Sequence, residues 1–420
     1  MAVAFDETVS YQEVEAERIG ALKLPERSAI AHPNVRQADI DLLAKAPESY
    51  IDTTHFDTVR FPPPQWAEQR FTEAARDGAL AYTGYRGNEE VLAAVAVNIS
   101  RFLGVQVDPK KNLILTPGTQ AALFSALSAR VNRGDRVAVM DPDYLFTARI
   151  LSFLGAEAAY VPLKLDEAGL YGPDLDVLET EFARRGTKHL VFSHPNNPTG
   201  AVFPRKTIAA IAALASRHGV SVVADELYSR LVYDGAEFVH LAAEDGMMAQ
   251  VATLLGPSKT ESLSGYRLGV VVGNENLIRA IENVLSITAL RAPAYAQHVL
   301  HGWLAGDDNW LKSRIVEFKA LRDMTARALG KLPWLKLHPQ QGTAYHWVDV
   351  SALGVPDAVV SAALLEKAGV LVSPGYQFGP TASGRFRICY ARDEKSWSEA
   401  LARMVDVLGD LARKHGVPNP

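Results

Sequence analysis

The sequence predicts an α/β fold in which a mostly parallel sheet is covered by helices on both faces. The first observation is a set of short, almost continuous apolar runs at residues 137–140, 190–192, 220–223, 251–255 and 269–272. Such runs are typical of strands that are buried on both faces. The second observation is that amphipathic stretches separate these runs, and this alternation of strand and helix indicates a parallel sheet.

Two of the stretches between the runs have clear helical spacing. From Thr119 onward, Leu123, Leu127 and Val131 recur every four residues, which places them on one face of a helix. Residues 205–217 form the second stretch. Gly219 is suited to end it, because glycine readily adopts the left-handed conformation that follows many helices.

The two ends of the chain differ from its middle. Residues 1 to about 60 are polar and irregular, and the Phe-Pro-Pro-Pro stretch at 61–64 interrupts any regular element. From about residue 300 we expect a long helix that contains Trp310 and Phe318, short strands near 345–348 and 385–390, and a closing helix at 397–414. This pattern indicates a smaller α+β domain.

Composition excludes several classes of protein. The chain has 420 residues, of which 48% are hydrophobic and 22% charged, and its formal net charge is −5. Neither disorder nor broad binding to nucleic acid or to a membrane surface is therefore expected. No run reaches the roughly 18 apolar residues of a membrane span, and the acidic N-terminus does not resemble a secretory signal. The single cysteine, Cys389, excludes a disulfide framework and multi-cysteine metal sites, so we expect a cytoplasmic protein without a bound metal.

Polar residues gather where the expected strands end, which is the edge at which open parallel sheets bind ligands. After the strand at 112–115, the loop 116–120 (Thr-Pro-Gly-Thr-Gln) leads into a helix, so free backbone N–H groups meet a helix N-terminus at a glycine. This arrangement suits a phosphate, although many loops use glycine only to turn. Residues 141–144, Asp-Pro-Asp-Tyr, follow the next strand, and Tyr144 suits either stacking on a flat ring or packing.

Three later strand ends carry further candidates. The loop 193–200 (Ser-His-Pro-Asn-Asn-Pro-Thr-Gly) is restricted by two prolines, which favours an amide presented at the crevice over a simple turn. Asp225 ends an apolar run, so it needs either a cation or donors, unless it is a helix N-cap. Lys259 follows the strand at 251–255. A desolvated lysine at this place is a nucleophile toward carbonyls, whereas an exposed loop lysine is the commoner case.

Together and in this order, the motifs carry a family resemblance. The chain resembles the fold type I, pyridoxal-phosphate-dependent aminotransferases of the aspartate aminotransferase superfamily from about residue 50 to 405. The most specific stretches are Asn196-Asn197-Pro198-Thr199-Gly200, Asp225-Glu226-Leu227-Tyr228, and Ser258-Lys259 with Ser264-Gly265-Tyr266-Arg267. The resemblance implies a seven-stranded sheet in a large cofactor-binding domain at 61–300, a small domain at 301–420, and an N-terminal arm at 1–60 that also contributes to the small domain.

The resemblance also implies roles for individual residues around pyridoxal 5′-phosphate. Lys259 holds the cofactor as an aldimine and later moves the substrate proton. Asp225 pairs with the ring nitrogen, while Asn197 and Tyr228 bind the phenolic oxygen. The remaining contacts to the cofactor are stacking by Tyr144, and phosphate binding by Gly118, Thr119, Gln120 and Arg267.

Two implied roles concern the substrate and the partner subunit. Arg387, together with Asn197, matches the groups that bind the α-carboxylate of the substrate, for which a bidentate guanidinium is well suited. Tyr82 matches a tyrosine that family members place on the phosphate of the other subunit, which implies a homodimer with shared sites.

The chain departs from the family pattern near both ends of the expected ligand. Gly256 stands where many relatives have a serine that binds the phosphate, so one donor is lost. His55 and Phe56 are bulkier than the glycines common near the α-carboxylate, which indicates either a reshaped pocket or a local shift of the strand. Arg60, Arg86 and Arg291 favour an acidic substrate if the family geometry places them at the site, and surface or interface positions explain them equally well.

Transamination between an L-amino acid and a 2-oxo acid is the activity that the resemblance favours. The same cofactor also supports a carbon–sulfur β-lyase or another lyase, which is the alternative. A non-catalytic regulator that kept the fold is less favoured, because the first 50 residues are acidic and show no helix-turn-helix pattern.

Overall fold

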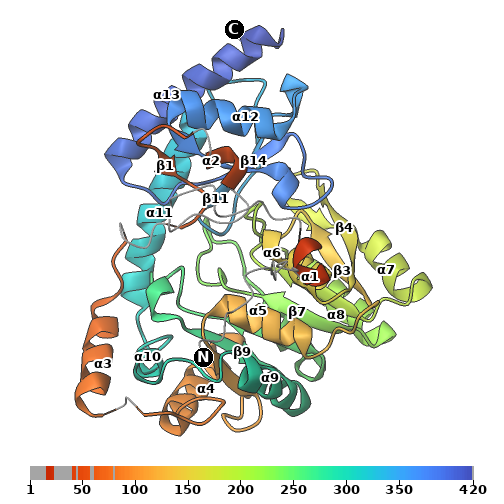
Figure 1. Cartoon of the computed structure of the whole chain (residues 1–420), viewed down its shortest axis with the longest axis vertical. Helices are drawn as coiled ribbons and strands as arrows, with labels where there is room; N and C mark the ends of the chain where they lie inside the picture. Colours follow the sequence, from red (N-terminus) through yellow and green to blue (C-terminus); the bar gives the residue numbers. More distant parts are fainter. Residues whose placement is uncertain (1–15, 23–39, 44–45, 57–60, 79–80, 419–420) are drawn as a thin grey trace, which may run out of the picture.

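The larger of the two main sheets forms the centre of the molecule (Figure 1). The computed structural model describes residues 16–22, 40–43, 46–56, 61–78 and 81–418. Within them, eight strands pair in the order β2-β9-β8-β7-β6-β3-β4-β5. Their bounds are β2 Leu113–Thr116, β3 Arg136–Asp141, β4 Glu157–Leu165, β5 Tyr171–Pro173, β6 His189–Ser193, β7 Ser221–Asp225, β8 Val251–Leu255 and β9 Gly269–Val272.

The pairing confirms the mostly parallel sheet. Neighbouring strands from β8 through β7, β6 and β3 to β4 run parallel. Strand β9 runs antiparallel to both β2 and β8, and β5 runs antiparallel to β4. The sheet therefore has one strand more than the expected seven, since the short β5 extends it at the edge.

Strand β4 has no continuous apolar run, and its burial explains why. Ala159 and Val161 are buried, whereas Tyr160 and Lys164 between and beyond them are exposed. A strand near the edge of a sheet is covered on one side only, so its sequence alternates instead of forming a continuous apolar run.

Helices cover both faces of this sheet. Along β3, Val137 and Val139 pack with helices α5, α6 and α9, whereas Ala138 and Met140 face the layer that contains α7 and α8. This alternation is the reason why the central strands read as continuous apolar runs. The helices are α4 Glu89–Leu103, α5 Thr119–Ser128, α6 Leu145–Phe153, α7 Leu175–Arg184, α8 Arg205–His218 and α9 Glu275–Thr288.

Two expected helix ends are clear in the structure. Gly219 follows α8 with φ of 62°, the left-handed conformation expected of it. The closing helix α13 (Glu394–Lys414) begins three residues earlier than expected, because the side chain of Asp393 accepts a hydrogen bond from the amide of Ser396 and caps it.

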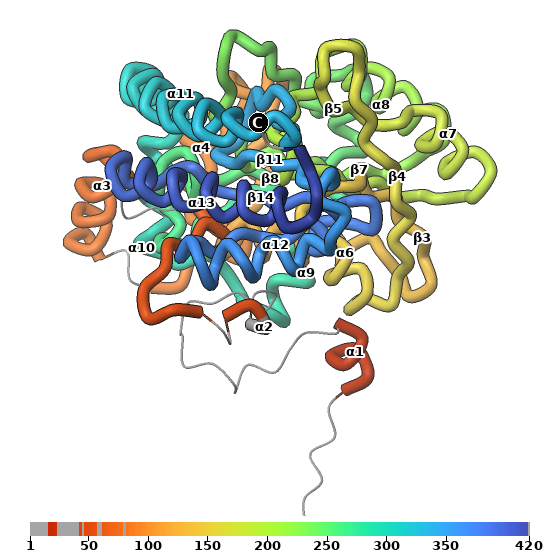
Figure 2. The backbone as a smooth tube through the Cα atoms, turned by 90° about the horizontal axis from the view of Figure 1, so that it is seen from above, coloured from red at the N-terminus to blue at the C-terminus, as the bar shows by residue number. Residues whose placement is uncertain are grey.

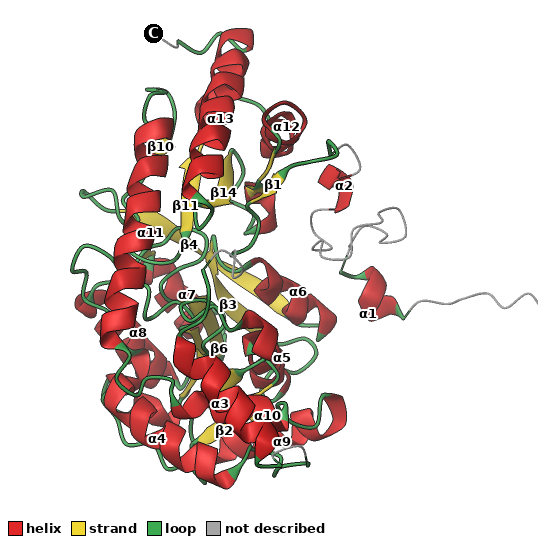
Figure 3. Ribbon diagram, turned by 90° about the vertical axis from the view of Figure 1, so that its left-hand side faces the viewer, coloured by secondary structure: helices red, strands yellow, loops and turns green. Residues whose placement is uncertain are grey.

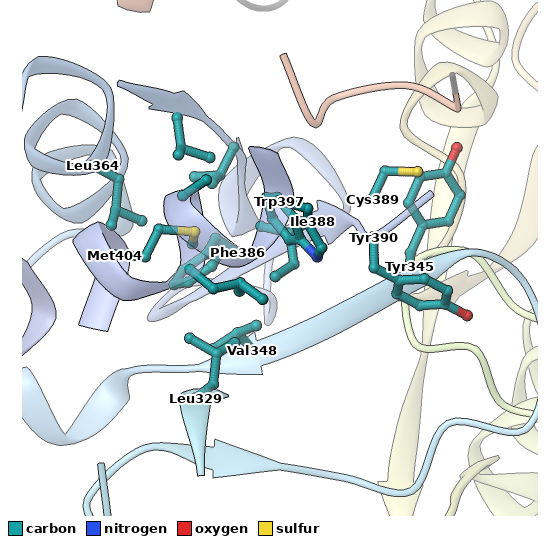
Figure 4. Packing of buried hydrophobic residues seen from close by; sticks show 14 of the residues in the cluster. Leu329, Tyr345, Val348, Leu364, Phe386, Ile388, Cys389, Tyr390, Trp397 and Met404 are labelled. Carbon is teal, nitrogen blue, oxygen red and sulfur yellow. The ribbon is translucent and has the colours of Figure 1, made fainter. Parts of the chain in front are cut away.

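A second, antiparallel sheet has the order β10-β11-β14-β13. Its strands are β10 Lys336–Leu337, β11 Tyr345–Asp349, β13 Ser373–Pro374 and β14 Arg385–Cys389. They pack with the helices α11 (Asp308–Leu329), α12 (Asp357–Ala363) and α13 around one apolar core. Figure 4 shows Phe386 and Ile388 of β14 in this core beside Trp397 and Met404 of α13.

The segment before the large sheet returns to this second unit. Strand β1 (Ile51–Asp52) pairs in parallel with β12 (Val370–Leu371), although more than 300 residues separate them. Figure 3 shows α11 running from the helices around the large sheet to the second unit. The domain boundaries at 60 and 300 stay a prediction, and much of the arm at 1–60 lies outside the described residues.

The other helices lie at the margins. They are α1 Glu17–Gly20, α2 Ile40–Leu43, α3 Gln65–Arg76 and α10 Ala294–Gln297. Figure 2 shows α1 at the edge near α6, where the guanidinium of Arg18 lies 5.6 Å from the ring centre of Phe153. No helix of the described ranges combines the length and the apolar character needed to cross a membrane.

Candidate active site

A cavity of about 210 Å³ lies at the carboxyl ends of the strands of the large sheet. Ser193 ends β6, Asp225 ends β7, and Lys259 follows β8. The second sheet closes the cavity with Tyr345 of β11 and Arg387 of β14. The sequence-predicted residues that line the cavity are Thr119, Gln120, Tyr144, Asn197, Asp225, Tyr228, Lys259, Arg267 and Arg387.

The turn before α5 has the form of an anion cradle. Gly118 has φ of 93°, and a Cβ built on it would overlap Nη2 of Arg267. The Arg267 side chain is held by its donation to the carbonyl of Ser264 at 2.7 Å. Thr119 Oγ1 is buried and has no hydrogen-bond partner within the described chain. A guanidinium, an unused hydroxyl and a helix N-terminus therefore meet at one point, which suits a phosphate.

Substitution of Gly118 with alanine is expected to weaken binding of pyridoxal 5′-phosphate, the cofactor that the family resemblance implies, by about 10- to 100-fold. With φ of 93° and ψ of 159°, Gly118 has a backbone conformation that is almost exclusive to glycine and costs an L-residue roughly 1–3 kcal/mol, and the added methyl group displaces Arg267. Gly104→Ala is the matched control, because Gly104 has φ of 74° but no atom near its Cβ position. Equal dissociation constants for the two variants, measured by titration of the cofactor, would contradict the cradle.

The missing serine at 256 has a local explanation. A Cβ on Gly256 would lie 2.9 Å from Thr119 Oγ1 and 3.1 Å from the carbonyl of Leu268. A side chain at 256 would therefore crowd the threonine hydroxyl that faces the cradle. The hydroxyl of Thr119 occupies the space that a serine side chain at position 256 would need, which explains the absence of that phosphate donor.

Asp225 lines the same cavity as Thr119 and Arg267 of the cradle. No helix starts at this residue, so the N-cap interpretation is wrong. Its Oδ1 accepts one hydrogen bond of 3.2 Å, from the amide of Leu227. Burial raises the pKa of Asp225 to about 6, and the charge of Lys259 acts in the opposite direction. A largely buried carboxylate with so few donors is suited to a cationic ligand.

Arg387 is almost fully buried, with 2% exposure. Its Nη1 donates to Oδ1 of Asn197 at 2.7 Å, and its Nη2 donates to the carbonyl of Thr54 at 2.5 Å. The guanidinium carbon also lies 4.0 Å from the ring centre of Tyr345. This arginine is thus oriented at the cavity wall, where a planar fork can bind a carboxylate.

Tyr228 and Tyr144 are placed by other polar groups of the cavity. The hydroxyl of Tyr228 lies 2.9 Å from that of Tyr345, and burial raises the pKa of Tyr228 well above its ordinary value. The hydroxyl of Tyr144 donates to Oε1 of Gln120 at 3.0 Å. Tyr228 is therefore a neutral hydrogen-bonding group at neutral pH.

Asp143 organises two of the loops and was not assigned a role from the sequence. Its carboxylate accepts bonds from the Ser193 amide at 3.1 Å and the Ser193 hydroxyl at 2.7 Å, and the same hydroxyl accepts from the amide of Asn197 at 2.9 Å. Burial raises the pKa of Asp143 to about 7 despite these donors. The only sequence signal is that Asp143 and Ser193 each lie at the end of an expected strand. The structure shows that these two strands, β3 and β6, are neighbours in the sheet.

A second group that the sequence did not indicate is a buried ion triad. Arg230 binds both Glu261 and Asp307, and all three side chains are at most 7% exposed. Arg230 lies two residues after Tyr228, and Glu261 lies two residues after Lys259. Asp307 directly precedes α11. The triad thus ties the two loops that carry Tyr228 and Lys259 to the helix that runs to the second sheet.

His55 and Phe56 lie in different surroundings. Phe56 is 2% exposed and packs in the second core, with its ring centre 5.3 Å from that of Phe318. It does not line the cavity, so of the two bulky residues only His55 can shape the pocket directly. His55 does line the cavity.

Tyr82 and two of the three candidate arginines lie outside the cavity. Tyr82 is 83% exposed and does not line the cavity of its own chain. Arg291 lies 4.6 Å from the ring centres of both Tyr82 and Tyr85, and Arg86 donates to Glu282 at 2.7 Å. Neither arginine lines the cavity, and Arg60 lies outside the described residues.

The arrangement defines a class of protein. A lysine, a buried aspartate and two arginines surround one cavity at the carboxyl edge of a parallel sheet, and a glycine turn beside them suits a phosphate. These are the features of an enzyme that holds a phosphate-bearing carbonyl cofactor on a lysine.

Comparison with known proteins gives the family. Residues 53–404 match the family described as aminotransferase class I and II, and the chain belongs to this family. It is thus a pyridoxal-phosphate-dependent transaminase, which confirms the family resemblance and the expected reaction.

Individual relatives differ in their named substrates. The chain is 31% identical to an aspartate/prephenate aminotransferase of Thermus thermophilus, covering 89% of this chain and 93% of the relative. It is 27% identical to an aromatic-amino-acid aminotransferase of Thermococcus litoralis, covering 83% and 89%. The crystal structure of an aspartate aminotransferase from Rhodobacter sphaeroides superposes with a TM-score of 0.84 at 36% identity, covering 94% of this chain and 98% of that one. All three are aminotransferases, and none supports the lyase alternative.

Proposed function

We propose that Lys259 carries pyridoxal 5′-phosphate and that the amino group passes between an L-amino acid and a 2-oxo acid in the cavity described above. The observation that carries the proposal is the placement of Lys259 in one cavity with Asp225, Arg267 and Arg387. The donor set fits the cofactor. The partnerless hydroxyl of Thr119 suits a phosphate oxygen, and the buried carboxylate of Asp225 suits a protonated ring nitrogen.

The cofactor, when bound, withdraws electrons from the substrate and so makes the hydrogen on its α-carbon acidic. The residues of the chain perform the other tasks. Arg387 binds the α-carboxylate, which retains that group and disfavours decarboxylation. Nζ of Lys259 removes the proton from the α-carbon and later returns one. Asp225 holds a proton on the ring nitrogen, Tyr144 packs on the ring, and Asn197 and Tyr228 hydrogen-bond its phenolic oxygen.

A half-reaction tests this proposal. The purified protein, loaded with cofactor, is mixed with single amino acids in the absence of any 2-oxo acid. The expected result is loss of the visible absorbance of the lysine-bound cofactor and appearance of its amine form, and a 2-oxo acid then restores the first spectrum. Release of ammonia without need for a 2-oxo acid would contradict transamination.

We also propose that two copies of the chain form a homodimer with shared sites. The support is a group of exposed side chains around Arg291: Tyr82 and Tyr85 pack on its guanidinium, Leu290 precedes it in sequence, and these three side chains are between 40% and 83% exposed. An apolar surface of this kind is typical of an interface between subunits. Residence in the cytoplasm belongs to the same proposal, and the single cysteine of the chain supports it.

Tyr82→Phe is expected to weaken cofactor binding by about 10-fold, the contribution of one hydrogen bond to a charged phosphate. The dimer should persist in light scattering, because only a hydroxyl is removed. Tyr295→Phe is the control, because Tyr295 is an exposed tyrosine outside the cavity, and it should leave the dissociation constant of the cofactor unchanged. A catalytically competent monomer, or equal cofactor affinity in both variants, would contradict the shared site.

A further inference from the structure

His55 lines the active-site cavity but has no role in the function proposed above. Its backbone is held at the carboxylate-binding arginine, because Arg387 donates to the carbonyl of the preceding residue, Thr54, at 2.5 Å. On the other side, Arg392 donates to the carbonyl of His55 itself at 2.5 Å. Two buried arginines thus fix the backbone that carries His55 beside the place where the α-carboxylate binds.

The imidazole of His55 is oriented by Asp52. Nδ1 lies 3.2 Å from Oδ2 of Asp52, and the other oxygen of Asp52 accepts from the amide of Thr54 at 2.8 Å and from its hydroxyl at 2.6 Å. Burial acts to raise the pKa of Asp52, but the bonds from His55 and Thr54 outweigh it and hold that pKa well below its usual range. The anionic Asp52 occupies Nδ1, so Nε2 is the nitrogen left for a ligand.

One of the side chains that line the cavity and can carry a charge has no role in the function proposed above. Lys259, Arg267 and Arg387 have roles toward the cofactor and the α-carboxylate, and Asp225 is the one carboxylate among the described residues of the wall. His55 is the remaining side chain there that can carry a positive charge. It is also accessible, with 49% of its side chain exposed.

We propose that His55, oriented by Asp52, is a specificity-determining residue that binds a second carboxylate at the far end of a dicarboxylic amino donor. The proposal rests on the function proposed above and names its substrate class. A hydrogen bond from Nε2 to an ionised carboxylate, with Nδ1 held by Asp52, is a charge-assisted contact of the kind that a carboxylate prefers. The sequence had linked an acidic substrate to Arg60, Arg86 and Arg291. In this proposal the residue that selects such a substrate is His55.

Direct binding of unreactive acids tests the proposal. Calorimetric titration of the cofactor-loaded protein compares glutarate, which has two carboxylates, with pentanoate, which has one. The wild-type protein should bind glutarate more tightly than pentanoate. The His55→Asn substitution should raise the dissociation constant of glutarate by about 10- to 100-fold and leave that of pentanoate nearly unchanged. The Asp52→Asn substitution should raise the dissociation constant of glutarate by a smaller factor. The control His415→Asn, at the exposed end of α13, should change the dissociation constant of neither acid.

Steady-state kinetics give the second readout. His55→Asn should lower kcat/KM for L-glutamate relative to L-norvaline, which has the same chain length without the second carboxylate. A wild-type protein with no preference for glutarate, or a variant that loses both acids equally, would overturn the proposal. If the His55→Asn variant still transaminates norvaline at the wild-type rate, the proposed function stands. If the wild-type protein shows no transamination at all, the proposed function is refuted, but calorimetry still measures the role of His55 in binding.

Discussion

Lys259→Ala is expected to lower kcat for transamination by at least about 10⁴-fold, at the upper end of what a positioned proton-transfer group contributes. The lysine is proposed to serve twice, as the amine that holds the cofactor and as the base that moves the α-proton. Alanine removes both functions while the walls of the cavity stay in place. Single-turnover absorbance with saturating amino donor measures the effect, because it separates proton transfer from product release.

A control and a rescue make this experiment specific. Lys331→Ala changes an exposed lysine outside the cavity and should retain full activity. Addition of a small primary amine to the Lys259→Ala variant should restore part of the proton transfer, with a rate that increases with the amine concentration. Activity in the variant above about one per cent of the wild type, without added amine, would show that another group is the base.

Local patterns were sufficient to predict most of the large sheet. The central strands β3, β6, β7 and β8 lie within one or two residues of the apolar runs, because burial on both faces leaves an unbroken signal in the sequence. Strand β4 gave no such signal, since Tyr160 and Lys164 face outward. The short strands β1 and β12 have two residues each, too few for any periodicity to appear.

In the candidate site, too, local patterns predicted some residues and not others. Thr119, Asp225 and Lys259 were predictable because each lies at the end of its own strand or a few residues after it, and parallel strands bring their carboxyl ends together. The position of Arg387 was implied only by resemblance to a family, because its strand belongs to the second sheet and no local pattern places that sheet over the first.

Contacts between distant segments account for what the sequence did not indicate. Asp143 bonds Ser193 across 50 positions, and the triad of Arg230, Glu261 and Asp307 spans 77. The opposite orientations of His55 and Phe56 depend on packing against Phe318, more than 250 residues later. Periodicity describes the face of an element on which a side chain lies, but not the partner that it meets there.

Asp225→Asn is the other substitution with a large expected effect. A buried carboxylate stabilises a proton on the ring nitrogen through its charge, whereas the amide of the same shape has no charge with which to do so. Removing one such preorganised electrostatic contact costs about 3–4 kcal/mol of transition-state stabilisation, or on the order of 10³-fold in kcat. Stopped-flow measurement of the amino-acid half-reaction at pH 8 gives this factor, and a loss below about 10-fold would contradict the assigned role.

The pH dependence of cofactor binding provides an independent check on the same residue. Burial raises the pKa of Asp225 to about 6 in the cofactor-free protein, with the charge of Lys259 opposing this rise. The carboxylate is therefore ionised above about pH 6 and protonated below it. Only the ionised form attracts a cationic ring nitrogen, so this group should make cofactor binding stronger as the pH rises from 5 to 7.

Comparison of the two proteins isolates that contribution. The phosphate of the cofactor titrates in the same range, but it does so equally with wild-type protein and with the Asp225→Asn variant. The ratio of their dissociation constants should thus approach one near pH 5, where Asp225 is neutral and resembles the amide, and should grow toward pH 7. A ratio that stays constant across this range would show that the charge of Asp225 does not contact the cofactor, whatever the effect of the substitution on kcat.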